Sequence, residues 1–180
     1  MLQTDTNNAD YKTENEPRLA NIEQFLSFVL GNEEYGVSIL RVQEIRSWEP
    51  VSRIPNVPVY EKGVVNLRGA IVPIIDLRER FNLGRAEYTP LTVVVVLQAQ
   101  VNGKSRTMGV VVDSVSDVVD VDKFSIQRPP DFGAKVSTEF INGLASVNQR
   151  MVMLLDVEKL LRLDGIDDMV TELAESESKH

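Results

Sequence analysis

The sequence repeats itself, and this repetition restricts the fold more than any other feature of the chain. GVSILRVQEI at residues 36–45 aligns with GVVVDSVSDV at residues 109–118, and GAIVPIIDL at residues 69–77 aligns with QRMVMLLDV at residues 149–157. The matching blocks occur in the same order in both halves. Ordered self-similarity of this kind is typical of a duplicated structural unit. We therefore predict two related subdomains of roughly 60–70 residues each.

The repeated blocks have the composition of short β-strands. FLSFVL at residues 25–30 is separated from an apolar run at residues 35–39 by Gly31-Asn32, and TVVVVLQAQ at residues 92–100 is followed by Asn102-Gly103. Asn-Gly between two apolar runs is a strong hairpin signal. Val, Ile and Thr also favour a pleated, half-buried surface. Both halves are therefore predicted to begin with a β-hairpin.

Each predicted subdomain is small for a core of its own. Curling a five-stranded sheet into a barrel hides its edge strands, and packing two barrels on one hydrophobic seam gives both a larger core. Brief helical turns are expected after Asp76 and Asp156. Apolar residues at helical spacing predict a C-terminal helix that contains Ile166, Met169, Val170 and Leu173. The predicted fold class is mainly β, with two five-stranded barrels on a shared seam.

The net charge lies at the ends of the chain. Acidic and basic residues balance in the body, so the net charge of -8 comes from acidic stretches at both termini. These stretches are most simply solubilising ends. We expect three regions: a disordered acidic lead at residues 1–22, a domain of two subdomains at residues 23–163, and an acidic helix or tail at residues 164–180. The subdomains are placed at about residues 23–90 and 91–163, with strand exchange between them allowed.

The residue inventory excludes several classes of function. The chain has no Cys, and its single His is His180, which excludes thiol chemistry and His-based triads. The acidic balance has the wrong sign for a nucleic-acid partner. The longest strongly apolar run, Val93–Leu97, is too short to cross a membrane, and no secretory signal is present. We expect a cytoplasmic protein with no metal, no cofactor, no nucleic-acid partner and no membrane insertion.

Two aspartates occupy repeated positions. Asp76 and Asp156 each follow an apolar strand-like block. Two carboxylates facing one another could act as a general acid and base. Each aspartate could equally be the N-cap of the helical turn that follows it. A duplicated cap explains the repetition directly, and we favour it.

Other polar and aromatic residues fit both a structural and a binding role. Arg68-Gly69 fits a hairpin corner in which Gly69 has a positive φ, and it also fits a projecting guanidinium that binds a partner carboxylate. The alternating segment from Val42 to Arg46 fits a charged edge strand or a docking surface. Trp48 and Phe132 fit packing beneath their own loops or anchoring an interface. The residues alone leave these alternatives open.

These segments resemble the CheW family, whose members couple chemoreceptors to a histidine kinase in bacterial chemosensory arrays. The resemblance covers about residues 23–163. Its most specific parts are NLRGAIVPIIDL at residues 66–77 and MGVVVDSVSDV at residues 108–118, taken together. It implies two SH3-like five-stranded barrels, in agreement with the duplication, and it implies no catalysis.

The resemblance also implies partners and contact residues. The partners are the cytoplasmic tip of methyl-accepting chemoreceptors and the regulatory domain of the kinase CheA. The receptor-facing residues are Val42, Glu44 and Arg68. The kinase-facing residues are Val51 and Arg53 on one surface and Arg128 and Phe132 on a second. Whether Gln127 or Arg128 takes the family's basic position stays open.

A non-catalytic adaptor is the function that these features predict. Such a protein holds receptor and kinase together and so raises their effective concentration, at receptor arrays beneath the inner membrane. Two alternatives remain. One is an adaptor of a non-flagellar chemosensory system, such as pilus motility or biofilm signalling. The other is an enzyme that uses Asp76 and Asp156.

Overall fold

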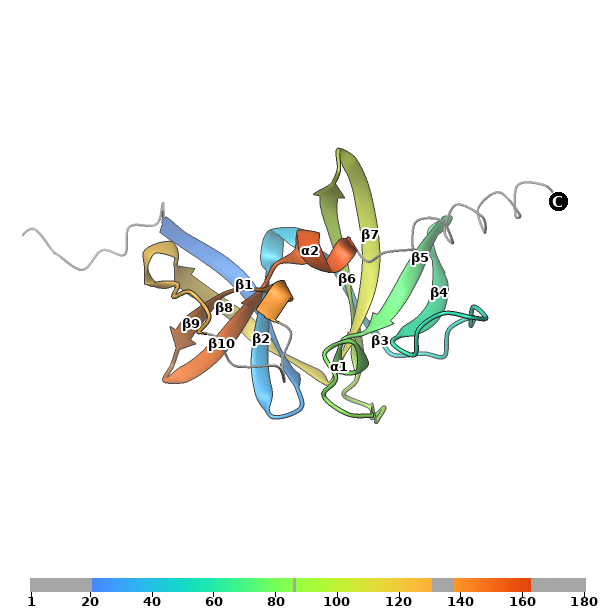
Figure 1. The fold of residues 1–180 in the computed structure, drawn as a ribbon, viewed down its shortest axis with the longest axis horizontal. Helices are drawn as coiled ribbons and strands as arrows, with labels where there is room; N and C mark the ends of the chain where they lie inside the picture. Colours follow the sequence, from blue (N-terminus) through green and yellow to red (C-terminus); the bar gives the residue numbers. More distant parts are fainter. Residues whose placement is uncertain (1–20, 86, 131–137, 163–180) are drawn as a thin grey trace, which may run out of the picture.

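A computed structural model describes residues 21–85, 87–130 and 138–162. Within these residues the chain forms two five-stranded sheets with short helices beside and between them (Figure 1). The prediction of a mainly β fold is confirmed. None of the helices in the described part of the chain is long and apolar enough to cross a membrane. The predicted C-terminal helix lies outside the described residues.

The first sheet has the strand order β8-β1-β2-β10-β9. Its strands are β1 (Ile22–Leu30), β2 (Glu33–Ser38), β8 (Ser114–Asp122), β9 (Ile141–Val147) and β10 (Arg150–Leu155). The second sheet has the order β3-β6-β7-β5-β4. Its strands are β3 (Val42–Ser47), β4 (Glu61–Leu67), β5 (Ala70–Asp76), β6 (Val93–Val101) and β7 (Lys104–Val112).

Short helices connect or follow several strands. The α-helices are α1 (Leu77–Arg80) and α2 (Val157–Leu161), and the 3-10 helices are η2 (Ile39–Arg41), η3 (Lys123–Ser125) and η4 (Thr138–Phe140). The predicted helical turns after Asp76 and Asp156 are therefore confirmed. In each sheet one pair of strands is parallel, β2 with β10 in the first and β5 with β7 in the second, and the other pairs are antiparallel.

The two repeats exchange strands. Strands β1 to β5 form the first repeat and β6 to β10 the second, and replacing each strand by its counterpart converts the order of the first sheet into that of the second. Each sheet combines the first hairpin of one repeat with the last three strands of the other. Both sheets thus take strands from both sides of residue 90. The exchange makes each sheet depend on the whole chain.

The predicted hairpins are present. Strand β6 turns into β7 at Asn102-Gly103, where both residues have positive φ, 52° and 77°, as a type I′ turn requires. The ladder continues to the pair Val101↔Lys104. Strand β1 likewise pairs with β2 up to Leu30↔Glu33. Local turn chemistry therefore sets the register of both hairpins.

The core lies where the two sheets meet. One continuous cluster of buried side chains includes residues of both sheets and both α-helices, and smaller clusters lie on the outer side of each sheet. Along β6, Val95 and Leu97 belong to the shared cluster, whereas Val94 and Val96 belong to the outer cluster of the second sheet. A strand buried on both faces has a continuous apolar sequence, which accounts for VVVVL. The predicted seam is confirmed.

Each sheet is curled so that its two edges approach. The segment after β3 forms an isolated bridge from Ser52 to Val64 in β4, and the segment after β8 forms the equivalent bridge from Gln127 to Leu144 in β9. These bridges join the edges without a continuous ladder. The bridges also fix the two segments that carry the candidate kinase-facing residues.

Candidate functional site

The two repeated aspartates cap helices. Asp76 Oδ1 accepts a hydrogen bond from the backbone N–H of Glu79 at 3.2 Å, and Asp156 Oδ1 accepts one from the N–H of Lys159 at 3.1 Å. A side-chain oxygen at the N-cap satisfies a donor that the first turn leaves unpaired. The prediction of duplicated caps is confirmed. Each capping bond is made to the helix that follows the aspartate. The two helices follow strands of different sheets, α1 after β5 and α2 after β10.

Asp76 has a second partner that sequence reasoning missed. Tyr88 donates its hydroxyl to Asp76 Oδ2 at 2.9 Å, and its ring stacks on Trp48 with 4.5 Å between centroids. The backbone N–H of Trp48 donates to the carbonyl of Thr92 at 3.2 Å. Trp48 therefore has a structural role in the segment between β3 and β4. Tyr88 connects that segment to the end of β5.

Burial determines the electrostatics of this carboxylate. Only 1% of Asp76 is exposed, and desolvation raises its pKa above the ordinary value, although hydrogen bonds from the Glu79 N–H and the Tyr88 hydroxyl act in the opposite direction. Burial also raises the pKa of Tyr88, and the charge of Asp76 adds to that shift. Tyr88 is therefore a neutral donor at physiological pH.

The raised pKa of Asp76 predicts a pH-dependent stability. A carboxyl with a higher pKa in the folded state loses its proton more readily on unfolding, so the free energy of unfolding falls as pH rises through the window between the unfolded and folded pKa values. Asp76→Asn keeps a cap and removes this titration. We expect the stability difference, wild type minus variant, to fall as pH rises from about 4, measured by urea denaturation. A difference that rises with pH would show a depressed pKa instead.

The three candidate receptor-facing residues lie close together. Arg68 donates to Glu44 Oε2 at 3.0 Å, and Arg46 lies 3.7 Å from the other carboxylate oxygen. Glu44 is on β3 and Arg68 is in the turn between β4 and β5, so the ion pair joins the two edges of the curled sheet. Val42, two residues before Glu44, is half-buried against the shared core. The structure thus brings Glu44 and Arg68 into contact and places Val42 on the same strand as Glu44, packed against the core.

The Arg68 side chain is accessible to a partner molecule. Its side chain is 89% exposed despite the ion pair, so the pair adds little to stability. Arg68 and Gly69 have positive φ of 51° and 87°, which makes the turn a tight hairpin corner. The guanidinium therefore projects from a well-defined backbone position. The geometry confirms the hairpin corner at Arg68-Gly69; the binding interpretation stays a prediction.

The candidate kinase-facing residues occupy equivalent places in the two repeats. The bridges from Ser52 and Gln127 are counterparts, so Val51 corresponds to Ile126 and Arg53 to Arg128. Val51 is half-buried, and both arginines are exposed. Gln127 and Arg128 are both exposed, and of the two only Arg128 is charged. Phe132 lies outside the described residues.

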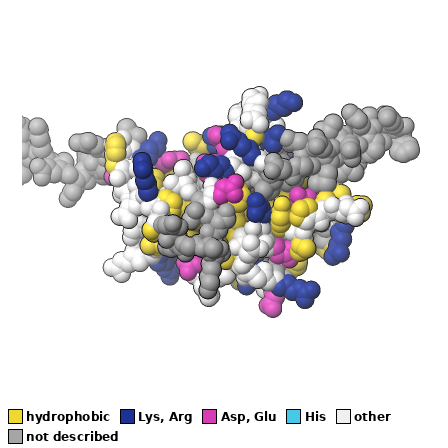
Figure 2. Space-filling model, viewed as in Figure 1, with side chains coloured by type: hydrophobic (Ala, Val, Ile, Leu, Met, Phe, Trp, Pro, Cys, Tyr) yellow, Lys and Arg dark blue, Asp and Glu magenta, His cyan; other side chains and the backbone are white. Residues whose placement is uncertain are grey.

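Charges of both signs are mixed on the face that Figure 2 shows. Figure 2 shows Lys and Arg side chains interspersed with Asp and Glu on one face, together with hydrophobic side chains. Several large hydrophobic residues are exposed, among them Leu40, Val59, Leu91 and Phe124. Interspersed charge around scattered apolar residues is compatible with protein partners.

Comparisons with known proteins identify relatives along most of the chain. The model of the CheW-like domain matches residues 24–164. A chemotaxis protein CheW of Klebsiella aerogenes is 50% identical over 139 residues, which cover 77% of this chain and 81% of that protein. A chemotaxis protein CheW of Rhizobium meliloti is 36% identical over 76% of this chain and 86% of its own length.

A solved structure has the same fold. The crystal structure of the scaffolding protein TtCheW from Thermoanaerobacter tengcongensis matches with a TM-score of 0.70 and 29% identity, covering 79% of this chain and 90% of that chain. That protein is a scaffolding protein, and the two relatives are chemotaxis proteins. The fold, the matched domain and the sequence identity agree, and the chain therefore belongs to the CheW-like family.

Proposed function

We propose that this protein is a non-catalytic adaptor that couples methyl-accepting chemoreceptors to the histidine kinase CheA. The observation that supports this most directly is the ion pair between Glu44 on β3 and the exposed Arg68 of the β4–β5 turn, with Val42 on the same strand as Glu44, in a chain 50% identical to a chemotaxis protein CheW. The group combines an apolar residue with an oriented ion pair. An amphipathic receptor helix offers the complementary surface.

The kinase contacts are assigned to the two equivalent segments. Val51 with Arg53 and Ile126 with Arg128 each place a half-buried aliphatic residue two positions before an exposed cation. A duplicated arrangement gives the adaptor two similar surfaces, so one molecule can contact two kinase domains or one kinase and another adaptor. Receptor and kinase then bind different parts of one body, which raises their local concentration. The protein would act at receptor arrays beneath the inner membrane.

Reversing one charge tests the receptor surface. Arg68→Glu places a second carboxylate beside Glu44 and removes the guanidinium, so affinity for a chemoreceptor tip fragment should fall by about tenfold, or 1.4 kcal/mol. Because Arg68 is exposed, the free energy of unfolding should change by no more than about 0.5 kcal/mol. Affinity is measured by titration with the purified tip fragment, and stability by circular dichroism in urea.

Two variants complete this experiment. Asn148→Glu adds a negative charge at the counterpart of Arg68 in the other sheet, where Asn148 is exposed and has φ 50°, and it should leave receptor binding unchanged. Arg53→Glu should weaken binding of the CheA regulatory domain and spare the receptor. Equal loss of receptor affinity in Arg68→Glu and Asn148→Glu would contradict the assigned surface. Folded wild-type protein that binds neither partner would overturn the adaptor function.

A further inference from the structure

One of the two proposed kinase contacts lies in a segment that forms no strand. Residues 48–60 connect β3 to β4 and carry Val51 and Arg53. An irregular segment has few backbone hydrogen bonds of its own, so contacts with the rest of the molecule determine how firmly it is held. The isolated bridge from Ser52 to Val64 fixes one point of it. The contacts at its two ends therefore determine how the segment is presented to a partner.

One buried residue, Asp76, is linked to both ends of this segment. Its backbone N–H donates to the carbonyl of Tyr60 at 2.8 Å, at the end that leads into β4. Its Oδ2 accepts the hydroxyl of Tyr88 at 2.9 Å. The Tyr88 ring stacks on Trp48, at the end that follows β3, with 4.5 Å between centroids and 19° between the ring planes. Asp76, Tyr88 and Trp48 thus form a latch that closes residues 48–60 into a loop.

The latch reaches the residues of the proposed kinase contact. Trp48 and Val51 both pack against the outer cluster of the second sheet, and the backbone N–H of Trp48 is held by the carbonyl of Thr92. Burial raises the pKa of Tyr88, whereas the positive charge of Arg53 acts in the opposite direction. Arg53 therefore lies within electrostatic range of the Tyr88 hydroxyl. The latch and the candidate contact residues occupy one continuous region.

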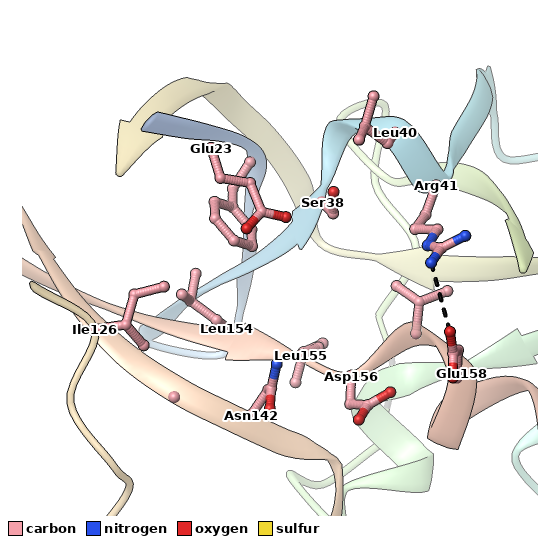
Figure 3. A pocket seen from close by; sticks show the side chains of 13 residues that line it. Glu23, Ser38, Leu40, Arg41, Ile126, Asn142, Leu154, Leu155, Asp156 and Glu158 are labelled. Atoms are coloured by element: carbon pink, nitrogen blue, oxygen red, sulfur yellow. Dashed lines mark hydrogen bonds and ion pairs between the residues drawn. The ribbon is translucent and has the colours of Figure 1, made fainter. Parts of the chain in front are cut away.

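The second repeat reproduces the backbone part of this arrangement. There the N–H of Asp156 donates to the carbonyl of Phe140 at 2.9 Å, the counterpart of the bond from Asp76 to Tyr60. The Asp156 side chain is half-buried and lines a cavity of about 430 Å³ (Figure 3), whereas Asp76 is almost completely buried. Burying a carboxylate is costly unless its oxygens accept hydrogen bonds. The Tyr88 hydroxyl therefore offsets part of the cost of burying Asp76.

We propose that Tyr88 is a positioning residue for the kinase contact of the first repeat. By joining Asp76 to Trp48, it holds residues 48–60 in the conformation in which they meet the kinase. A segment that is ordered before binding loses less conformational entropy when the partner binds. Opening the latch therefore lowers the affinity for the kinase without removing a side chain that contacts it. This inference rests on the proposed adaptor function.

Hydrogen exchange tests the latch on the full chain without a partner. The amide of Val64 donates to the carbonyl of Ser52 at 3.0 Å, so its exchange rate reports whether the segment stays on β4. Tyr88→Ala removes both the hydroxyl and the ring, and Val64 should exchange at least about fivefold faster in this variant. Gly103→Ala strains the β6–β7 turn instead, and it should leave this rate unchanged. Unchanged protection of Val64 in Tyr88→Ala would overturn the latch.

Binding separates a positioning role from a purely structural one. In Tyr88→Ala the affinity for the CheA regulatory domain should fall by about fivefold, while the affinity for the receptor tip fragment stays at the wild-type value. Tyr88→Phe keeps the ring and loses only the bond to Asp76, so its loss should be smaller.

The two partners also separate the ways in which this inference could fail. Wild-type kinase affinity in Tyr88→Ala, or an equal loss of affinity for both partners, would overturn the positioning role. An equal loss of kinase affinity in Gly103→Ala would also overturn it, because general destabilisation would then be the cause. Folded wild-type protein that does not bind the kinase domain would overturn the proposed kinase contact itself, a failure that precedes any substitution.

Discussion

Gly63→Ala is expected to lower the free energy of unfolding by more than about 3 kcal/mol. Gly63 has φ +144°, a conformation that side-chain-bearing residues rarely adopt, and an added Cβ would lie 1.9 Å from the backbone oxygen of Ser52. This oxygen accepts the hydrogen bond from Val64 that joins the edges of the second sheet. The clash involves backbone, so no side-chain rotation relieves it. Relief requires the sheet edges to separate.

Gly103→Ala is the matched control for this prediction. Gly103 also has positive φ, +77°, but an added Cβ there meets nothing within 4 Å, so the cost is the backbone strain of about 1 kcal/mol alone. Urea denaturation of both variants isolates the clash as the difference. If Gly63→Ala cost no more than Gly103→Ala, the approach of Ser52 to β4 would not contribute to stability.

The close approach at Gly63 also positions the residues of the proposed kinase contact. Ser52 lies between Val51 and Arg53, so the close approach at Gly63 holds both residues in place. In the second repeat an added Cβ on Gly143 would lie 2.4 Å from Ile126 Cγ2 and 3.2 Å from the oxygen of Gln127. The segment that leads to Arg128 therefore also packs closely on a glycine, here chiefly through the Ile126 side chain. A glycine at the same place in each repeat allows the segment that carries a proposed kinase contact to close each sheet.

Local features of the fold could be predicted from the sequence because neighbouring residues determine them. Asn102-Gly103 specifies a tight hairpin turn, and an aspartate before a helical turn specifies a cap, as Asp76 and Asp156 show. The run Val93–Leu97 indicates a strand buried on both faces. Each of these depends on a few consecutive residues and on the turn or cap that they favour.

The pairing between distant strands could not be predicted. Similar hairpins in both repeats offer similar edges, so the alignment shows which strands correspond but not which repeat supplies the neighbours of β1 or β6. The contact from Tyr88 to Asp76 also depends on how the segment after α1 folds back.

The contact between Glu44 and Arg68 shows what the structure adds to the family resemblance. The resemblance assigned both to a receptor surface without relating one to the other. The structure adds that they form an ion pair across the two edges of the curled sheet. Since the pair orients the guanidinium, a change at either residue alters the charge presented by both. The resemblance could name the two residues individually, whereas their ion pair follows only from the curled sheet.

Leu97→Ala is expected to cost about 2–5 kcal/mol. Leu97 on β6 is fully buried in the cluster shared by both sheets, so the substitution leaves a cavity at the seam. Leu91→Ala is the control, because Leu91 precedes the same strand and is 69% exposed, and it should change stability by no more than about 0.5 kcal/mol. Urea denaturation of both variants measures the difference.

The form of this unfolding transition distinguishes one cooperative body from two. Trp48 is the only tryptophan and packs against the outer cluster of the second sheet, whereas far-ultraviolet circular dichroism reports both sheets. Because the repeats exchange strands and share one core, the two signals should coincide within each protein. They should share one midpoint in the wild type and one lower midpoint in Leu97→Ala. Separate midpoints would show two independently stable sheets. An adaptor of that kind could hold its partners together but could not pass a conformational change rigidly from one to the other.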